Sequence, residues 1–188
     1  IGAQAFLSPG IGYAGGTLGR DIAVLRGLGK AGKLKVRLIN AVREVNRNRQ
    51  KKLIEKIKSI LGTIKNKKIT ILGLTYKPGT STLRRSMSLE IAKKLLKCGA
   101  KINAFDPKVS VLPKAYSKVK IFSDPYSAVK DSAVIILATD WPEFRELNFA
   151  KIKKNTSKSV VIDCKNFLSP ENITKNNIKY YGIGFNTE

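Results

Sequence analysis

Histidine is absent from the 188 residues, and the sequence contains only two cysteines, one methionine and one tryptophan. Without histidine the chain cannot build the Ser-His or Cys-His pairs that activate many nucleophiles, nor a histidine-based metal site. The two cysteines, Cys98 and Cys164, are too few and too unpatterned for a disulfide framework or a zinc site, so both are expected to be buried free thiols. Most hydrolytic mechanisms are therefore not expected, and no metal site is predicted.

Acidic residues are also scarce, with 13 Asp and Glu against 36 Lys and Arg, which gives a formal net charge of +23. Such a charge attracts polyanions and phosphates, so nucleic acid has to be considered as a partner. Many cations occur in pairs such as Lys51-Lys52 and Lys93-Lys94, a pattern typical of solvated helix faces. No RNA-binding aromatic motif, zinc-finger spacing or clear helix-turn-helix is recognisable. We therefore interpret the charge as solvated surface and expect no nucleic-acid partner.

Long hydrophobic runs are missing too. No segment approaches the roughly 18 uninterrupted apolar residues of a membrane span, and no signal-peptide pattern opens the chain. With 43% apolar residues the chain can bury a sizeable core in one or two domains. We expect a soluble, cytoplasmic protein that does not contact a membrane. Because the chain begins at Ile1 rather than Met, inside a loop-like segment, we also expect a preceding N-terminal portion.

The first 21 residues are rich in glycine. Gly10 to Gly15 match the dinucleotide pattern G-x-G-x-x-G, but Ser8-Pro9 interrupts any preceding strand and no acidic residue lies about 20 positions on. We interpret this segment as a loop rather than a cofactor site. Asp21 is expected to cap a short helix over residues 22–25.

Apolar residues recur at helical spacing from about Leu34 to Leu61, with basic residues on the other faces. The spacing predicts one long amphipathic helix over 34–61. This helix is longer than a small domain needs, so it is expected to connect two domains or to pack against a second subunit. Asn46 and Arg47 on this helix are interpreted as solvated surface.

From residue 63 the pattern alternates between strands and helices. Strands are expected near 69–74, 101–105, 119–122, 133–138, 159–163 and 178–183. Helices are expected over 88–98 and 125–129, with further turns from Pro142 and Phe149. This alternation predicts an α/β fold, a Rossmann-like, doubly wound and mainly parallel sheet preceded by the long helix. We therefore divide the chain into a region 1–62 and a sheet domain 63–188.

The strongest functional signal lies between Ile69 and Leu89. A β-branched strand ends at Gly73, a polar loop carries the cations Lys77, Arg84 and Arg85, and a helix begins near Ser86. In an open α/β sheet such a loop lies at the carboxyl end of its strand, where helix amides and cations can bind a phosphate.

Polar groups also follow the other expected strands: Asp106, Thr139-Asp140-Trp141, and Asp163 with Lys165 and Asn166. Because parallel strands end at one edge, these groups are expected to converge on one ligand. Each group alone has a simpler interpretation as a turn, a packed aromatic ring or a solvated cation.

These residues together resemble the UDP-glucose/GDP-mannose dehydrogenase family. The resemblance rests on Gly-Leu-Thr-Tyr-Lys-Pro at 73–78 with Thr80, Arg84 and Ser86, then Ala-Phe-Asp-Pro at 104–107, Thr-Asp-Trp-Pro-Glu-Phe at 139–144, Asp-Cys-Lys-Asn at 163–166 and Gly-Ile-Gly at 182–184. The helix from Leu34 resembles the central helix of that family. Residues 9–21 resemble its active-site segment Pro-Gly-x-Gly-x-Gly-Gly-x-Cys-x-x-Lys-Asp.

The resemblance implies an oxidation of the C6 alcohol of a nucleotide-sugar such as UDP-glucose to a carboxylate, through a cysteine-bound thioester. It places NAD in an N-terminal domain, the nucleotide of the sugar in the C-terminal domain, and a homodimer contact on helix 34–61. By position, Tyr76, Lys77 and Lys165 would bind substrate, Arg84 would approach the NAD phosphates, and Asp21 would belong to the catalytic segment.

The sequence departs from that family at the reacting position. Thr17 stands where the catalytic cysteine is expected, and a threonine hydroxyl cannot form a thioester. Gly19 and Arg20 replace a proline and a lysine of the same segment. Lys165 replaces an arginine, which keeps the charge but loses bidentate phosphate geometry. The chain alone is therefore not expected to catalyse the whole reaction.

Three hypotheses stay open. The first is a C-terminal portion, or a degenerate relative, of a nucleotide-sugar dehydrogenase that still binds the nucleotide and dimerises. The second is a chain that completes an active site together with a separately encoded NAD-binding subunit. The third is a basic polyanion-binding or structural dimerisation protein derived from this fold.

Overall fold

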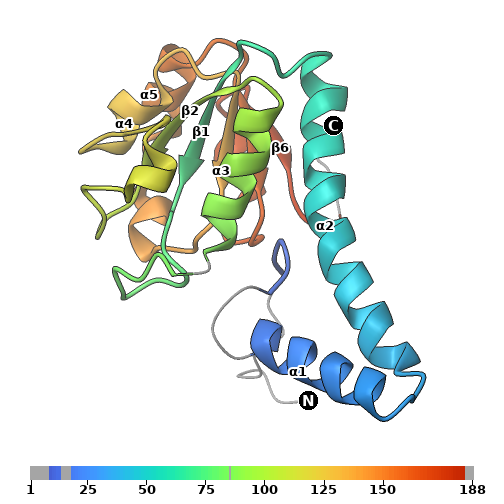
Figure 1. Cartoon of the computed structure of the whole chain (residues 1–188). Helices are drawn as coiled ribbons and strands as arrows, with labels where there is room; N and C mark the ends of the chain where they lie inside the picture. Colours follow the sequence, from blue (N-terminus) through green and yellow to red (C-terminus); the bar gives the residue numbers. More distant parts are fainter. Residues whose placement is uncertain (1–8, 14–17, 85, 185–188) are drawn as a thin grey trace.

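The computed structural model describes residues 9–13, 18–84 and 86–184, and its centre is a six-stranded sheet (Figure 1). The strands are β1 (Lys68–Leu72), β2 (Lys101–Phe105), β3 (Val119–Ile121), β4 (Val134–Leu137), β5 (Val160–Asp163) and β6 (Lys179–Tyr181). Their order is β3-β2-β1-β4-β5-β6 and every neighbouring pair is parallel. In register, Ile71 of β1 lies between Ala104 of β2 and Ile136 of β4.

Helices connect these strands and precede them. They are α1 (Leu18–Ala31), α2 (Arg37–Leu61), α3 (Met87–Lys97), α4 (Pro125–Val129), α5 (Phe149–Asn155) and α6 (Pro170–Thr174), with 3-10 turns at Lys114–Tyr116 and Pro142–Glu146. No helix among the described residues is long and apolar enough to cross a membrane.

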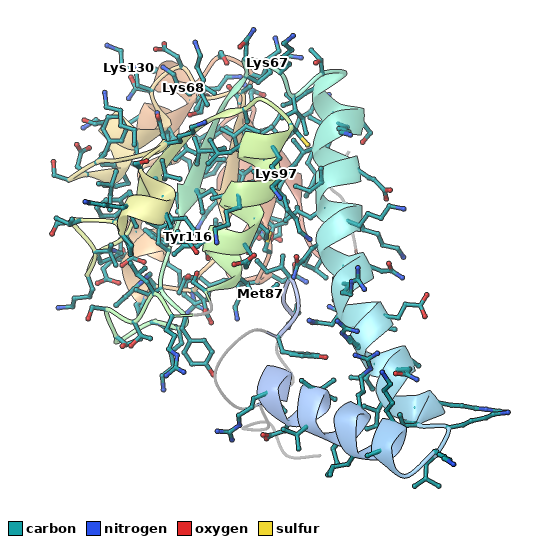
Figure 2. The ribbon with its side chains drawn as sticks, viewed as in Figure 1. Lys67, Lys68, Met87, Lys97, Tyr116 and Lys130 are labelled. Atoms are coloured by element: carbon teal, nitrogen blue, oxygen red, sulfur yellow. The ribbon has the colours of Figure 1, made fainter. Side chains whose placement is uncertain are left out.

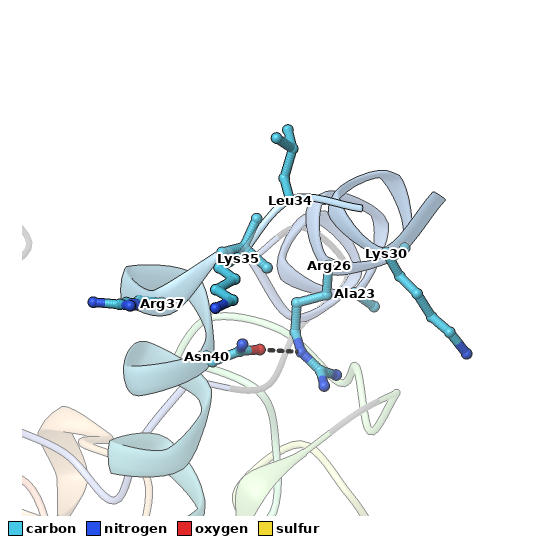
Figure 3. A pocket seen from close by; sticks show the side chains of 9 residues that line it. Ala23, Arg26, Lys30, Leu34, Lys35, Arg37 and Asn40 are labelled. Carbon is cyan, nitrogen blue, oxygen red and sulfur yellow. Dashed lines mark hydrogen bonds between the residues drawn. The ribbon is translucent and has the colours of Figure 1, made fainter. Parts of the chain in front are cut away.

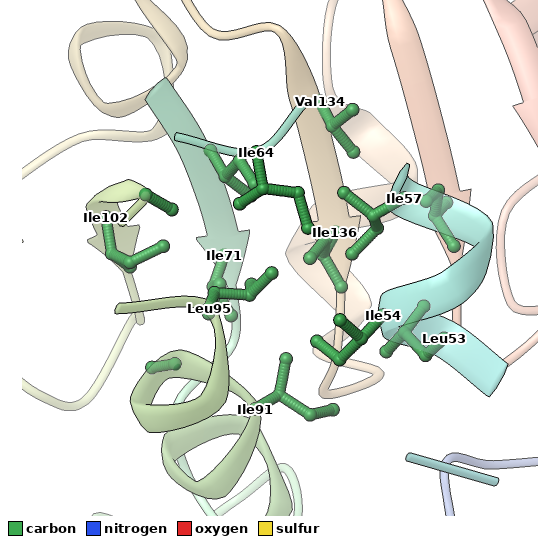
Figure 4. Packing of buried hydrophobic residues seen from close by; sticks show 14 of the residues in the cluster. Leu53, Ile54, Ile57, Ile64, Ile71, Ile91, Leu95, Ile102, Val134 and Ile136 are labelled. Atoms are coloured by element: carbon green, nitrogen blue, oxygen red, sulfur yellow. The ribbon is translucent and has the colours of Figure 1, made fainter. Parts of the chain in front are cut away.

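Both faces of the sheet are covered, as the doubly wound prediction requires. On one face α3 and the second half of α2 pack against the central strands, with Ile57 and Leu95 fully buried; Figure 4 shows Ile57 and Ile54 facing Ile136. On the other face a second cluster gathers Phe144, Phe149 and Tyr180. Because both faces are dry, β4 and β5 are almost wholly apolar.

The first half of α2 and all of α1 extend away from the sheet (Figure 1). We call residues 18–52 the arm. Large apolar side chains of the arm are exposed: Leu18 61%, Val24 53%, Leu25 47%, Leu28 64%, Leu34 69%, Leu38 76%, Val42 37% and Val45 56%. The arm thus presents apolar surface that nothing in the described chain covers.

All six expected strands are confirmed, and so is the helix after β1. Ser86 caps α3 by accepting a bond from the Leu89 amide, and Gly99 follows the helix in the left-handed region with φ +82. Asp124 caps α4 as expected.

Two helix predictions in the arm were inaccurate. The long helix begins at Arg37 rather than Leu34, because Lys33 adopts a positive φ of 54 and breaks the chain direction. The short helix expected over 22–25 is 14 residues long and begins at Leu18, so Asp21 lies in its first turn instead of capping it. The short helix α6 was not anticipated.

Candidate functional site

The carboxyl ends of β1 and β4 approach each other closely at Gly73. This glycine has φ +88, and a Cβ at this position would lie 2.5 Å from the Thr139 Cβ and 2.7 Å from the Thr139 amide nitrogen. No side chain fits there, and glycine also tolerates the left-handed conformation. The Thr139 hydroxyl closes the contact by donating to the Thr75 carbonyl at 2.9 Å.

Asp106 ties three strand ends together. Its side chain follows β2, is 3% exposed, and accepts bonds from the amides of Leu74 at 2.7 Å and Thr75 at 3.0 Å. The indole of Trp141, which follows β4, donates to the same oxygen at 3.1 Å. Two amides of the loop after β1 are therefore already bound by a carboxylate of the protein, which leaves the helix amides and the cations as the groups expected to bind a phosphate.

The helix that follows this loop is closed in the same way. Ser86 Oγ accepts from the Leu89 amide and donates to the Leu74 carbonyl at 2.6 Å. The loop between β1 and α3 is therefore held by its own side chains. Its capacity to bind an anion rests on the side chains of Lys77 and Arg84, which are both exposed.

Lys165 and Asp140 form an ion pair across the ends of β5 and β4. Their Nζ and Oδ1 atoms are 3.4 Å apart, and the side chains are 25% and 29% exposed. The structure thus brings Lys165 next to the β4 end, as the convergence hypothesis expects. Tyr76 is 52% exposed and, like Lys77, lies in the loop after β1.

Asp163 fixes the backbone that carries Lys165. Its buried carboxylate accepts bonds from the amides of Lys165, Phe167 and Leu168, each at 2.8 Å, and from the Tyr180 hydroxyl at 3.0 Å. Asp163 is therefore a structural acceptor rather than a free acid.

The two cysteines are free thiols. Burial, followed by the neighbouring Asp163 charge, raises the pKa of Cys164, so its thiol stays protonated. Protonated thiols are poor nucleophiles, so Cys164 is not suited to act as one. Cys98 is only partly buried, so the expectation of full burial was wrong for this residue.

The glycine-rich segment before the arm is clamped onto α2. Asn46 Oδ1 accepts from the Tyr13 amide at 2.7 Å, and Asn46 Nδ2 donates to the Tyr13 carbonyl at 3.0 Å. Arg49 donates to the Gly10 carbonyl at 2.9 Å, and Ile11 enters the core at 4% exposure. Gly12 leaves room for this clamp, because a Cβ there would lie 2.3 Å from Asn46 Oδ1.

The interpretation of Asn46 as solvated surface was therefore wrong, whereas Arg47 is exposed as expected. Sequence reasoning missed Asn46 because its partner, Tyr13, lies 33 residues away in a glycine-rich segment that was interpreted only as a loop. A polar residue close to the apolar stripe of a helix was the available signal.

A cavity of about 620 Å³ adjoins this segment between α2 and the residues after β6. Three cations of α2, Arg49, Lys52 and Lys56, line it together with Tyr181 and Gly182. Asn166 clamps its far wall through two bonds to Ile183, at 3.0 and 2.7 Å. Lys77 and Lys165 do not line this cavity, so the edge of the sheet offers two separate groups of cations.

The two residues predicted for the catalytic segment, Thr17 and Asp21, are not placed in either of these groups of cations. Thr17 lies outside the described residues. Asp21 accepts a bond from the Arg20 guanidinium at 3.1 Å in the first turn of α1. Among the residues that the structure describes, no group of three or more His, Cys, Asp or Glu could hold a metal ion.

Comparisons with known proteins point to the same family of dehydrogenases. Residues 70–170 match the sequence model of the UDP-glucose/GDP-mannose dehydrogenase family, UDP binding domain. The chain is 32% identical over 185 residues to UDP-glucose 6-dehydrogenase TuaD of Bacillus subtilis, and 34% identical over 185 residues to the UDP-glucose 6-dehydrogenase of Rickettsia conorii. In both alignments 96% of this chain is covered, but only 40% and 43% of the relative.

A solved UDP-glucose dehydrogenase from Pyrobaculum islandicum superposes with a TM-score of 0.77 at 25% identity, covering 94% of this chain and 39% of that one. The NDP-N-acetyl-D-galactosaminuronic acid dehydrogenase from Methanosarcina mazei, 23% identical, shares the fold with a TM-score of 0.83 over 97% of this chain and 40% of that one. The chain thus spans about two fifths of the length of these proteins.

Proposed function

Since the chain belongs to the UDP-glucose/GDP-mannose dehydrogenase family, we propose that its sheet domain binds the nucleotide diphosphate of a UDP-sugar such as UDP-glucose. The observation that carries this proposal is the partly buried Lys165 at the edge of the sheet, paired across strands with Asp140. A diphosphate would replace Asp140 as the partner of Lys165. Lys77, exposed in the loop after β1, supplies a second cation for the same ligand.

Lysine suits this role through charge rather than through fixed geometry. Charge-assisted bonds to phosphate oxygens are roughly twice as strong as neutral ones. Partial burial of Lys165 lowers the local dielectric and strengthens the attraction further. Tyr76 is placed beside Lys77 in sequence and is proposed as the third substrate-binding residue.

A titration calorimetry experiment tests this site with UDP, UDP-glucose and GDP-mannose at millimolar ligand. Lys77→Ala and Lys165→Ala should each weaken UDP binding about 10- to 100-fold, because a hydrogen bond to a charged group contributes roughly 1.5–3 kcal/mol. Lys154→Ala serves as the control, since Lys154 is an exposed lysine in the last turn of α5. An absence of measurable binding heat with all three ligands, or an equal loss of affinity in the Lys154→Ala control, would refute the nucleotide site.

We further propose that this domain takes part in the NAD-dependent oxidation of the UDP-sugar. The reaction also requires residues outside this chain. The described loop after β1 does not fit the pyrophosphate of a dinucleotide, because Asp106 already binds the amides of Leu74 and Thr75. Arg84, exposed in that loop, is the residue that would reach the NAD phosphates from this side.

Thr17 limits what the chain does by itself. A threonine hydroxyl without an adjacent base is a weak nucleophile and forms no thioester. If the rest of the site is intact, Thr17→Cys should raise NADH formation when an NAD-binding subunit of a relative is added, and neither chain alone should turn over. An inactive mixture that Thr17→Cys does not change would remove this catalytic part of the proposal and leave nucleotide binding untouched.

The arm is proposed to form a homodimer through its exposed apolar side chains. Leu38, Val42 and Val45 lie on one stripe of α2 and are not covered by the described chain. Sedimentation equilibrium should show a dimer that Leu38→Glu with Val45→Glu converts to a monomer, while thermal unfolding of the dilute protein changes little. A monomeric parent protein at high micromolar concentration would refute the dimer.

A further inference from the structure

The arm carries a second surface that differs in chemistry from its apolar stripe. Two adjoining hollows, of about 670 and 620 Å³, lie along the arm and share Arg26 and Asn40. Figure 3 shows Arg26 of α1 reaching Asn40 of α2 across the first hollow, with a bond of 2.8 Å. We call the two hollows together the arm groove.

Cations dominate the lining of the arm groove. Besides Arg26, the first hollow is lined by Lys30, Lys35 and Arg37. The second is lined by Arg43, Arg47, Lys51 and, from α3, Lys94. Glu44 is the acidic residue in the lining, and no aromatic side chain of the described residues contributes. Eight positive charges thus face one continuous surface with one negative charge.

Most of these charges have no counter-charge within the described chain. Among the described residues, Lys51 pairs with Glu55, with Nζ and Oε1 3.5 Å apart and both side chains exposed. Arg43, Arg47 and Lys51 follow one another at intervals of four residues, so they lie on one side of α2 and repel each other. The repulsion within this row is relieved when a polyanion binds, and the polyanion then releases its own condensed counterions.

The cation row and the apolar stripe occupy opposite sides of α2. With about 100° of rotation per residue, Arg43, Arg47 and Lys51 centre roughly 180° away from Leu38, Val42 and Val45. A dimer formed through the apolar stripe therefore leaves the row free. A second copy is a poor occupant of the groove itself, since each chain carries a net charge of +23.

We propose that the arm groove binds the sugar–phosphate backbone of a nucleic acid without reading its bases. Four of its eight cations are arginines, whose planar forks match phosphate oxygens in pairs. The absence of aromatic rings from the described lining removes the stacking platforms that grip bases. Contacts to phosphate position a nucleic acid but carry no sequence information.

This inference revises the view of the charge as a uniformly solvated surface. Other lysines are scattered over the surface. Figure 2 shows Lys67, Lys68 and Lys130 far from the arm, and Lys68 begins β1, so it lies at the edge opposite the carboxyl ends of the strands. The test must therefore separate the groove from the net charge. Arg43, Arg47 and Lys51 are exposed, so their replacement by glutamine leaves the core intact.

The experiment measures fluorescence anisotropy of a labelled 20-nucleotide single strand over a range of salt concentrations. Its groove variant is Arg43→Gln with Arg47→Gln and Lys51→Gln. Its matched control is Lys154→Gln with Lys158→Gln and Lys179→Gln, three exposed lysines of the sheet domain. Both variants lose three charges, and circular dichroism verifies that both fold.

The groove variant should bind at least tenfold more weakly at 50 mM salt, with a salt slope shallower by about 2, because single strands lose roughly 0.7 per phosphate contact. The control should stay within about twofold of the parent protein, and strands of different sequence should bind alike. Equal losses in both variants, or no binding by the parent protein, would overturn the proposal. Poly-glutamate binding as tightly as the strand would overturn the assignment to nucleic acid.

The expected loss of strand binding in the groove variant does not depend on the proposed nucleotide-sugar site. UDP titration of the groove variant should match the parent protein, because Lys77 and Lys165 do not line the groove. Loss of strand binding with UDP binding retained supports the groove, and loss of both in the groove variant refutes its separation from the sheet domain.

Discussion

The two halves of α2 have the same amphipathic spacing and opposite surroundings. In the second half Leu53, Ile57 and Leu61 are at most 6% exposed and join the core of the sheet domain. In the first half Leu38, Val42 and Val45 are 76%, 37% and 56% exposed. Hydrophobic periodicity therefore identifies the apolar side of a helix without saying what covers it. In one half the cover is the sheet, and in the other it has to come from outside the described chain.

The same contrast appears in the way helices begin. Of the helices in the sheet domain, α3, α4, α5 and α6 start with a side chain that accepts a bond from the first turn. In the arm, α2 starts after Val36, which makes no such bond. A side-chain cap typically contributes about 1 kcal/mol, so α2 begins without this local stabilisation. Four substitutions probe this contrast.

Ile57→Ala should have the largest effect. Ile57 is fully buried between α2 and the sheet, and truncating such a side chain costs about 2–5 kcal/mol through lost burial and a residual cavity. Urea unfolding of dilute protein measures the loss of free energy of unfolding.

Val45→Ala on the exposed side of the same helix is the matched control. It should change the free energy of unfolding by less than about 0.5 kcal/mol, as is usual at exposed positions. If Val45→Ala destabilised the dilute monomer as much as Ile57→Ala, the contrast between the two halves of α2 would be lost.

Asp106→Ala should cost about 3 kcal/mol. The buried carboxylate accepts from the amides of Leu74 and Thr75 and from the indole of Trp141, and each buried donor left without a partner costs roughly 1–3 kcal/mol. Thermal unfolding measures the effect, and Asp140→Ala, at a carboxylate nearby that is 29% exposed, should cost less than about 1 kcal/mol. An Asp106 variant as stable as the parent would mean that the strand ends are held by other contacts.

Asp106 also marks the limit of what the sequence could predict. Local patterns predict the six strands, their mainly parallel pairing and the start of α3 near Ser86. Strands buried on both faces read as apolar runs, and a serine before a helix is a direct signal of a cap. The bonds of Asp106 do not, since they join residues more than 30 positions apart. The sequence predicted polar groups at one edge but could not show that one of them, Asp106, binds two amides of the loop after β1.

The arm was predicted less well for a related reason. The apolar spacing already begins at Leu34, so the later start of α2 at Arg37 was missed, and so was the full length of α1. The clamp by Asn46 was missed because its place beside the apolar stripe of α2 does not identify its partner, Tyr13, 33 residues away. The distribution of cations around α2 becomes meaningful only when α1 closes one side of the arm groove.

Asn46→Ala tests whether the glycine-rich segment before the arm is held in place by its two hydrogen bonds to α2. Removing both bonds to Tyr13 should cost about 1–2 kcal/mol, since a hydrogen bond typically contributes about 1 kcal/mol. Hydrogen exchange of the Tyr13 amide should accelerate at least tenfold, because opening of the segment becomes easier. The neighbouring Arg47→Ala, at an exposed residue, should leave this exchange unchanged; equal acceleration in both variants would contradict the clamp.

Asp124→Ala should have the smallest effect, about 1 kcal/mol, and this effect should depend on pH. Bonds from the Ser127 side chain and amide lower the folded-state pKa of Asp124 from its ordinary value of 3.8. A lowered folded-state pKa means that the carboxylate stabilises the fold fully above 3.8 and loses this contribution as the pH falls through the lower folded-state pKa. The difference in free energy of unfolding between parent and variant should therefore be constant at neutral pH and shrink only in strong acid. A difference that grew on acidification would show that the protonated side chain is the better cap. Because Val36 makes no such bond at the start of α2, Val36→Ala should produce no comparable pH-dependent change, which separates a capped helix of the sheet domain from the uncapped helix of the arm.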